Sequence, residues 1–368
     1  MAAATIANSI WAADPGGDAL ATPACTIAGR SDGVERGVNR TNLAWELHWK
    51  ATIDQMAAHG VTAVRLTLTQ PIERSAEIAA YAGLKNLRVL MNVPLSLSSF
   101  YEPSVVPRQG QARIRAVRRL SDLDISRYQG VLGEFLQNLD QRGGRLVALE
   151  VGNEINWADF NGDLPVGPRG QILDEDALRQ TADHARVIEG LRKYGIALDV
   201  SRALLRASDA GKAALVIAAG LYAPSPWTLE SGGAALTLRA TKALFDRLGI
   251  TRAADALAVH VYPANEASFP QMVAALQSAT EICGDRGQGK PCFITEWGFA
   301  NSSPLAARDD SVRLARFRTF ERALACIDRA QDIRAAYLFS WDESPAYSVW
   351  RANRLLDGGT IFGDPSIE

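Results

Sequence analysis

The chain lacks the motifs that mark several large enzyme classes. Its four histidines and four cysteines do not cluster with the spacing of a metal site. No Gly-rich phosphate loop follows a first strand, which argues against a nucleotide-dependent enzyme. Gly-x-Ser-x-Gly, the nucleophile motif of α/β-hydrolases, is also absent. We therefore expect neither a metal nor a cofactor.

Charge and hydropathy exclude further partners. The formal net charge is only −2, which gives no reason to expect nucleic acid or an anionic membrane as a partner. No apolar run approaches the roughly 18 residues that span a bilayer. The first basic residue is Arg30, so the N-terminus lacks the charged start of a signal peptide. This favours either a cytoplasmic protein or a mature secreted or periplasmic chain behind a new Met.

The cysteines lean towards the secreted or periplasmic alternative. Cys283 and Cys292 bracket a polar, Gly-rich loop that a disulfide can close, although two unpaired thiols fit the same pattern. Cys25 and Cys326 form a second possible pair, which the sequence alone leaves open.

What the chain does have is a regular alternation of apolar, strand-like runs and longer amphipathic stretches. Such alternation is typical of βα units around a parallel sheet. Eight strands are predicted near residues 34–39, 62–68, 87–93, 145–151, 213–218, 255–261, 291–296 and 334–340. Helices are predicted between them, in 42–59, 122–140, 174–194, 236–248, 268–282 and 309–329. Eight such units predict a single-domain (β/α)8 TIM barrel over residues 34–368, after an irregular N-terminal extension at 1–33.

Two connections are unusually long and follow strands, which places them on the catalytic face of a barrel. Residues 94–120 contain three prolines and a basic cluster from Arg108 to Arg119. Residues 155–173 contain Trp157, Phe160, three glycines and two prolines. Long loops on this face normally shape a substrate groove. The basic cluster fits either an acidic polymer as ligand or a solvated loop.

Two of the apolar runs end on glutamates, at Glu154 and Glu296. A carboxylate at the C-terminal end of a barrel strand lies where such enzymes place their chemistry. Two such acids, on different strands of one ring, face each other. A pair of facing carboxylates is what most glycoside hydrolases use to cleave a glycosidic bond.

Further polar and aromatic residues stand in or at the ends of the predicted strands. The pieces Gly152-Asn153-Glu154, His260-Val-Tyr262, Thr295-Glu296-Trp297-Gly298 and Ser340-Trp341, with Arg65 in the second strand, resemble the retaining glycoside hydrolases of clan A, which include families 5 and 39. The matches run in the order of the clan from about residue 34 to residue 345. Family 5 enzymes usually carry a histidine at the end of the third strand, where this chain has Asn92, so family 39 or another branch fits equally well.

The resemblance implies a role for each matching residue. Glu154 is expected to be the general acid and then the general base, and Glu296 the nucleophile. Arg65 is expected to keep Glu296 ionised, and Tyr262 to orient it. The remaining expected roles concern the substrate: Asn153 donates to the sugar 2-hydroxyl, His260 contacts substrate or Glu154, and Trp341 forms a flat floor for the sugar. Outside the resemblance, Trp157 in its loop is either a further sugar platform or a core residue.

The sequence therefore predicts a retaining β-glycoside hydrolase that cleaves a poly- or oligosaccharide through a glycosyl-enzyme. Endo-action in an open groove and exo-action in a closed pocket both fit. A transglycosylase with the same intermediate is an alternative, because the acceptor depends on water access. A barrel that binds carbohydrate without turning it over is a third hypothesis, which the complete set of expected catalytic residues disfavours.

Overall fold

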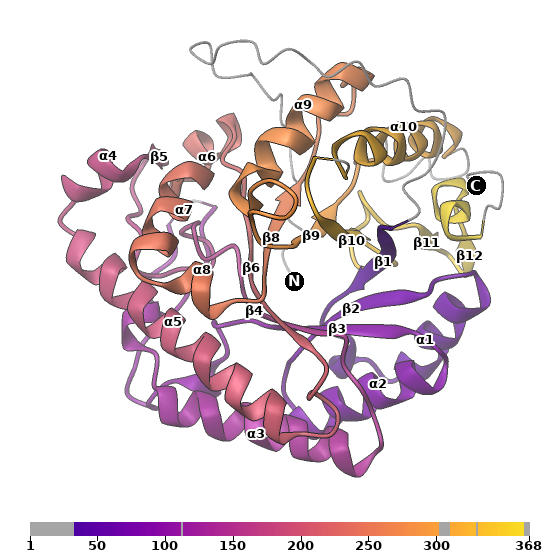
Figure 1. The fold of residues 1–368 in the computed structure, drawn as a ribbon, viewed down its shortest axis with the longest axis horizontal. Helices are drawn as coiled ribbons and strands as arrows, with labels where there is room; N and C mark the ends of the chain where they lie inside the picture. The colour runs from indigo at the N-terminus through magenta and orange to yellow at the C-terminus, as the bar shows by residue number, and fades with distance from the viewer. Residues whose placement is uncertain (1–32, 112, 302–309, 329, 364–368) are drawn as a thin grey trace.

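The computed structural model describes residues 33–111, 113–301, 310–328 and 330–363. Within these residues, eight parallel strands close into a barrel in the order β1-β10-β9-β8-β6-β4-β3-β2 (Figure 1). They are β1 (Glu35–Arg40), β2 (Ala63–Thr67), β3 (Arg88–Val93), β4 (Ala148–Asn153), β6 (Leu215–Leu221), β8 (Ala256–Val261), β9 (Cys292–Trp297) and β10 (Ile333–Leu338). Each overlaps one predicted strand, so the predicted (β/α)8 barrel is confirmed. The extension predicted at 1–33 lies almost wholly outside the described residues.

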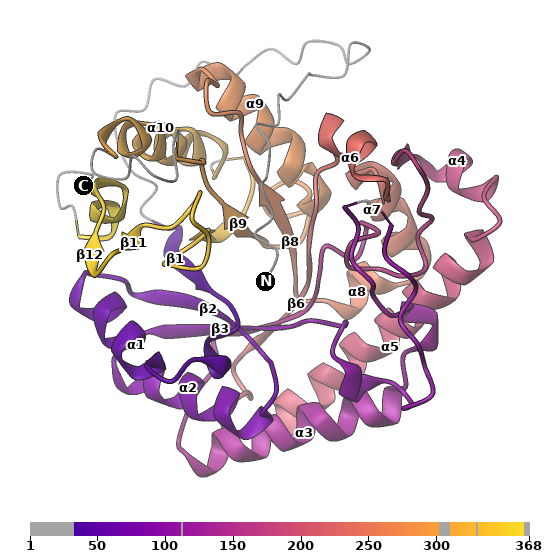
Figure 2. The same ribbon diagram turned by 180° about the vertical axis from the view of Figure 1, so that it is seen from behind.

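Helices surround the barrel, as both end-on views show (Figures 1 and 2). The longer ones are α1 (Trp49–Ala58), α2 (Ile72–Leu84), α3 (Ile125–Gln141), α5 (His184–Ala207), α7 (Leu238–Arg247), α9 (Phe269–Thr280) and α10 (Ser311–Asp328). Short helices are α4 (Glu175–Arg179), α6 (Pro226–Ser231) and α8 (Ile250–Ala253). Their starts follow local chemistry: Asp124 caps α3 by accepting from the backbone N–H of Ser126 and Arg127.

The connections carry further short elements. Short 3₁₀ helices are η1 (Leu43–Trp45), η2 (Ser98–Phe100), η3 (Leu120–Asp122), η4 (Glu281–Cys283) and η5 (Asp357–Phe362). The loops after β4 and β6 pair through β5 (Gln171–Leu173) and β7 (Ala234–Leu236), and a hairpin of β11 (Trp350–Arg351) and β12 (Arg354–Leu355) follows β10. The β5/β7 pairing joins two loops on the same end of the barrel.

The core has two layers, because side chains alternate along a strand. Outward-facing apolar residues pack against the helices in one large cluster. Inward-facing apolar residues fill the barrel towards the N-terminal ends of its strands, in a second, smaller cluster that includes Ala63, Leu90, Ala148, Phe293 and Tyr337. This inner plug closes one end of the barrel and leaves the strands' C-terminal ends to polar residues.

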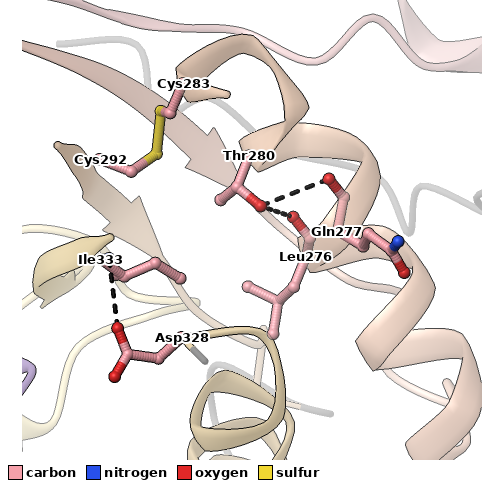
Figure 3. Close-up of a disulfide and its surroundings, with 7 residues drawn as sticks. All are labelled: Leu276, Gln277, Thr280, Cys283, Cys292, Asp328 and Ile333. Atoms are coloured by element: carbon pink, nitrogen blue, oxygen red, sulfur yellow. Dashed lines mark hydrogen bonds between the residues drawn. A yellow bond between two sulfur atoms is a disulfide. The ribbon is translucent and has the colours of Figure 1, made fainter. Parts of the chain in front are cut away.

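Cys283, at the end of η4, forms a disulfide with Cys292, the first residue of β9 (Figure 3). Of the two alternatives that the sequence leaves open for this pair, the structure has the disulfide. Cys25 lies outside the described residues, and with it the second possible pair. Among the described helices, none combines the length and the hydrophobicity that crossing a membrane requires.

Candidate active site

Two positions beyond the apolar plug, the inward-facing side chains become polar. Arg65 follows Ala63 in this way, Glu150 follows Ala148, and Thr295 follows Phe293. Each side chain of this polar layer is at most 2% exposed; its members are Asn39, Arg65, Asn92, Glu150, His260 and Thr295. Because buried polar groups are costly unless they are hydrogen-bonded, the layer must be internally paired.

Arg65 is the centre of that pairing. Its Nε donates to Glu150 Oε2 at 2.6 Å, and its Nη2 donates to Asn153 Oδ1 at 2.8 Å. Its Nη1 donates to both Asn39 Oδ1 and Glu296 Oε1, each at 2.8 Å. One guanidinium thus links β1, β2, β4 and β9, and its rigid fork fixes the positions of all four acceptors.

Glu154 lies immediately beyond β4, where the chain turns sharply. Gly152 has φ 89° and Glu154 has φ 44°, both in the left-handed region. Asn92 Nδ2 donates to Gly152 O at 2.6 Å, and the backbone N–H of Glu154 donates to Gly220 O at 2.8 Å. These bonds hold the turn that carries the carboxyl group over the barrel. Asn92 therefore supports the site from below.

Glu296 reaches the same place through an irregularity in β9. Consecutive side chains of a regular strand point to opposite faces. Here the pairing of β8 with β9 shifts register between Val259 and His260. Thr295 and Glu296 both reach the interior: Thr295 Oγ1 donates to Glu150 Oε1 at 2.9 Å, while Glu296 binds Arg65. A local irregularity of this kind re-aims a side chain.

His260 lies between the two glutamates. Its Nδ1 is 2.7 Å from Glu154 Oε1 and 3.7 Å from Glu296 Oε2. One carboxylate oxygen of each glutamate and a ring nitrogen of His260 all lie within 4.8 Å of one another. Tyr262 donates its hydroxyl to Glu296 Oε2 at 2.7 Å. The same three residues are of the kinds that bind metal ions, but the imidazole nitrogen facing Glu154 is already engaged.

The surroundings shift the two carboxyl groups in opposite directions. Burial raises the pKa of Glu154, and the negative charges of Glu296 and Asp159 add to this against the lowering effect of His260. Burial would also raise the pKa of Glu296, but His260, Arg65 and the hydrogen bond from Tyr262 outweigh it and lower that pKa. Burial lowers the pKa of His260, yet the two glutamates outweigh burial and raise it. One carboxyl group is thus set up to hold a proton and the other to stay ionised.

The structure places two predicted sugar platforms elsewhere. Trp341 is fully buried in the outer core, stacked on Trp350 with 5.7 Å between ring centroids and close to His59. Its side chain therefore packs outside the strands, and the prediction of a sugar floor at Trp341 is not met. Trp157, 8% exposed, stacks on Tyr222 at 4.6 Å, so the core alternative describes it better.

Three residues near the site were missed from the sequence. Phe339, the residue after β10, is half-buried, with its ring 6.3 Å from that of Tyr262 and 5.9 Å from that of Tyr347. Asn39 and Glu150 belong to the polar layer. A signal existed for Glu150: a single charge inside the apolar run Leu-Glu-Val, in phase with the inward-facing Ala148.

The basic cluster binds the neighbouring loop. Arg108 donates to Leu164 O at 2.9 Å and to Ala158 O at 2.8 Å. Arg115 Nε donates to Asp159 Oδ2 at 2.8 Å. These two arginines therefore tie the loop after β3 to the loop after β4. This structural role is part of neither alternative considered for the cluster, the acidic polymer as ligand or the solvated loop.

Comparisons with known proteins agree with this geometry. The family model "Glycosyl hydrolase catalytic core" matches residues 239–363, a segment that contains His260, Tyr262 and Glu296. Among curated proteins, no relative was found.

Solved structures share the fold. The AHE enzyme from Alicyclobacillus herbarius has a TM-score of 0.55 and 11% identity, covering 90% of this chain and 96% of that one. A family 1 β-glucosidase from Thermotoga maritima has a TM-score of 0.53 and 10% identity, and the match covers 91% of this chain and 98% of that one. A family 5, subfamily 18 enzyme from Bifidobacterium longum subsp. longum was solved with Manβ1-4GlcNAc. It has a TM-score of 0.53 and 14% identity, and the match covers 90% of this chain and 77% of that one.

At these identities the solved structures speak for the fold, and the family model adds the chemistry. The predicted resemblance to clan A glycoside hydrolases fits both findings. The match over residues 239–363 supports an O-glycosyl hydrolase, and the solved glycosidases share the (β/α)8 fold of this chain.

Proposed function

We propose that the protein is a retaining β-glycoside hydrolase acting on a poly- or oligosaccharide, with Glu154 as acid/base and Glu296 as nucleophile. The observation that carries this proposal is a pair of carboxyl groups that lie close together and whose pKa values are shifted in opposite directions. Oxygens of Glu154 and Glu296 lie within 4.8 Å of each other, which is close to the carboxyl separation of about 5–5.5 Å typical of retaining enzymes. Inverting enzymes need roughly 6.5–9.5 Å to admit a water.

The proposed reaction has two displacements. Glu154 gives its proton to the glycosidic oxygen while Glu296 Oε attacks the anomeric carbon, so the C–O bond to the leaving sugar breaks and a glycosyl-enzyme forms. Glu154, now ionised, takes a proton from water, whose oxygen attacks the same carbon and releases Glu296. The raised pKa of Glu154 and the lowered pKa of Glu296 support these assignments.

Asn153 is proposed to bind the sugar 2-hydroxyl. Its Oδ1 accepts from Arg65 Nη2, which fixes the side-chain amide with its NH₂ on the opposite side. Among the described residues, that NH₂ group meets no acceptor, so its donors are available to substrate. A hydrogen bond to the 2-hydroxyl strengthens in the oxocarbenium-like transition state and thus favours turnover.

The disulfide between Cys283 and Cys292 supports a secreted or periplasmic location as the second part of the proposal. Disulfides persist in oxidising compartments and are rare in the cytosol. A polymeric substrate outside the cell is consistent with that location.

The test is product analysis by NMR with the purified protein on aryl β-glycosides and on a panel of β-glucans, mannans, xylans and bacterial exopolysaccharides. We expect at least one substrate to be cleaved, with the β-anomer appearing first. An α-anomer as first product would contradict the retaining mechanism. Products longer than the substrate would identify the transglycosylase alternative, and binding without turnover would identify a non-catalytic barrel.

A further inference from the structure

Glu150 is a third carboxylate at the site, and the proposed reaction gives it no role. It lies on β4, four residues before Glu154, and is fully buried. All four of its hydrogen-bond partners are donors. Oε2 accepts from Arg65 Nε at 2.6 Å and Asn92 Nδ2 at 3.2 Å, and Oε1 accepts from Gly220 N at 2.8 Å and Thr295 Oγ1 at 2.9 Å.

This arrangement makes Glu150 an acceptor only, which is the behaviour of an ionised carboxylate. Ionised carboxylates in a barrel interior are costly unless a cation and further hydrogen bonds compensate them. Arg65 supplies the cation, and the three neutral donors come from β3, β6 and β9. The group is therefore held rigidly by three strands besides β2.

Arg65 is shared between Glu150 below and Glu296 above. Its Nε binds Glu150, while Nη1 binds Glu296 Oε1 at 2.8 Å. Arginine has a long side chain with several rotatable bonds, and its guanidinium positions a partner accurately only if the planar group is itself fixed. The contact at Nε holds the inner edge of that group, on the side away from Glu296 and Asn153.

We propose that Glu150 is a positioning residue of the reaction: it anchors Nε of Arg65, so that the far side of the guanidinium holds Glu296 in line for attack and holds Asn153 for the sugar. The hydrogen-bond partners of Glu150 are Arg65, Asn92, Gly220 and Thr295 and include neither glutamate of the proposed catalytic pair, so its effect passes through Arg65. This inference rests on the proposed role of Glu296 as nucleophile.

The experiment is a double-mutant cycle of Glu150→Gln, Arg65→Met and the double variant, with kcat and KM measured on an aryl β-glycoside that the wild type cleaves. Gln must turn its amide nitrogen towards two of the four donors and carries no charge opposite Arg65, so the anchor of Arg65 is weakened. We expect Glu150→Gln to lower kcat about 10²-fold, the cost of small misplacement of a reacting group, with KM nearly unchanged. The double variant should be no slower than Arg65→Met alone, and more stable, because no buried carboxylate is left without its cation. Losses that multiply in the double variant would overturn the proposal.

A matched control is available on the outside of the barrel. Arg36 Nε donates to Glu321 Oε2 at 2.6 Å, and Glu321 is 1% exposed, so this pair is also a buried Arg–Glu contact, between β1 and α10. Glu321→Gln should lower the melting temperature and leave kcat near the wild-type value. An equal fall of kcat in Glu321→Gln, or wild-type kcat in Glu150→Gln, would reduce Glu150 to a structural role.

If Glu150→Gln does not fold, Thr295→Val removes one hydrogen bond from Glu150 Oε1 and keeps its charge. It should lower kcat several-fold at constant KM, and an unchanged kcat would overturn the proposal.

A 2-deoxy-2-fluoro glycoside separates this inference from the proposed function. Mass spectrometry of the labelled wild type should find the sugar on Glu296; a label elsewhere refutes the proposed nucleophile. A label on Glu296 together with multiplying losses refutes only the role of Glu150.

Discussion

The imidazole of His260 faces the carboxyl group of Glu154, with 2.7 Å between Nδ1 and Oε1. The same nitrogen lies 3.7 Å from Glu296 Oε2, so the ring bridges the proposed acid and the proposed nucleophile. A Cβ on Gly220 would collide with this ring and with Thr295 Oγ1, so glycine at that position leaves room for the imidazole. His260 thus acts on both carboxyl groups at once, which distinguishes it from Arg65.

His260→Asn should move the whole pH profile of kcat/KM to higher pH. The acid limb marks ionisation of Glu296, and the basic limb marks loss of the proton from Glu154. The positive charge of His260 lowers the pKa of both groups, so its removal raises both. The apparent values belong to the coupled pair. A profile that does not move would mean that His260 acts as a neutral hydrogen-bond partner.

Arg65→Met should move mainly the acid limb. Arg65 binds Glu296 directly, and its other acceptors are Glu150, Asn39 and Asn153 rather than Glu154. Without the cation, the pKa of Glu296 should rise by roughly one to three units, and the acid limb should shift upwards by that amount. The basic limb should rise less, through the coupling of the two carboxyl groups. The position of the limb is the diagnostic, since kcat also falls; a fixed acid limb would leave Arg65 a scaffold residue. Circular dichroism must first show that the variant is folded.

Glu296→Gln should abolish turnover while the fold and ligand binding persist. The amide keeps the shape of the side chain and its contact distance to Tyr262, but it cannot attack the anomeric carbon. Loss of a covalent nucleophile costs roughly 10⁴-fold or more in kcat. The measurement is single-turnover kinetics beside calorimetric titration with an oligosaccharide. A rate above about a tenth of wild type would remove Glu296 from this role.

Glu154→Ala should slow substrates with poor leaving groups far more than activated aryl glycosides, which need little protonation to depart. Azide should restore the rate, because it attacks the glycosyl-enzyme without a general base, and the product should be the β-glycosyl azide. Rates with and without azide on a matched pair of aryl glycosides provide the measurement. Equal damage to both substrates, or an α-azide, would assign the acid/base role to another residue.

The fold and the chemical pair could be read from the sequence because both depend on local pattern. Apart from β1, which is short and charged, each barrel strand is a largely apolar run, and Glu154 and Glu296 stand at the ends of two of them. The β5/β7 pairing could not be predicted in this way, since both strands have three residues and lie within loops. Pattern also does not show which strands meet in a polar layer, so the link from Glu150 through Arg65 to Glu296 required coordinates.

Side-chain direction at the strand ends was the weakest part of the sequence prediction. The pairing of β10 with β9 shifts register between Ala336 and Leu338, just before the chain leaves the barrel. Beyond that point the period of two no longer fixes which side chain points inward. The nearby aromatic residues Phe339 and Trp341 are therefore indistinguishable by pattern, although one lies beside Tyr262 and the other packs in the outer core.

This difference gives a paired test. Phe339→Ala should raise KM about tenfold, because losing an aromatic contact of about 1.4 kcal/mol corresponds to that factor, with a small change in melting temperature. Trp341→Ala should leave KM close to wild type and cost about 3–5 kcal/mol of stability, as is usual when a large buried side chain is truncated. Both variants are compared by thermal unfolding and by kinetics on one oligosaccharide. The opposite pattern, with KM sensitive to Trp341 and stability sensitive to Phe339, would restore Trp341 as the sugar floor. The two outcomes separate cleanly because Trp341 is covered by Trp350, whereas the ring of Phe339 is half-buried beside the tyrosine that holds Glu296.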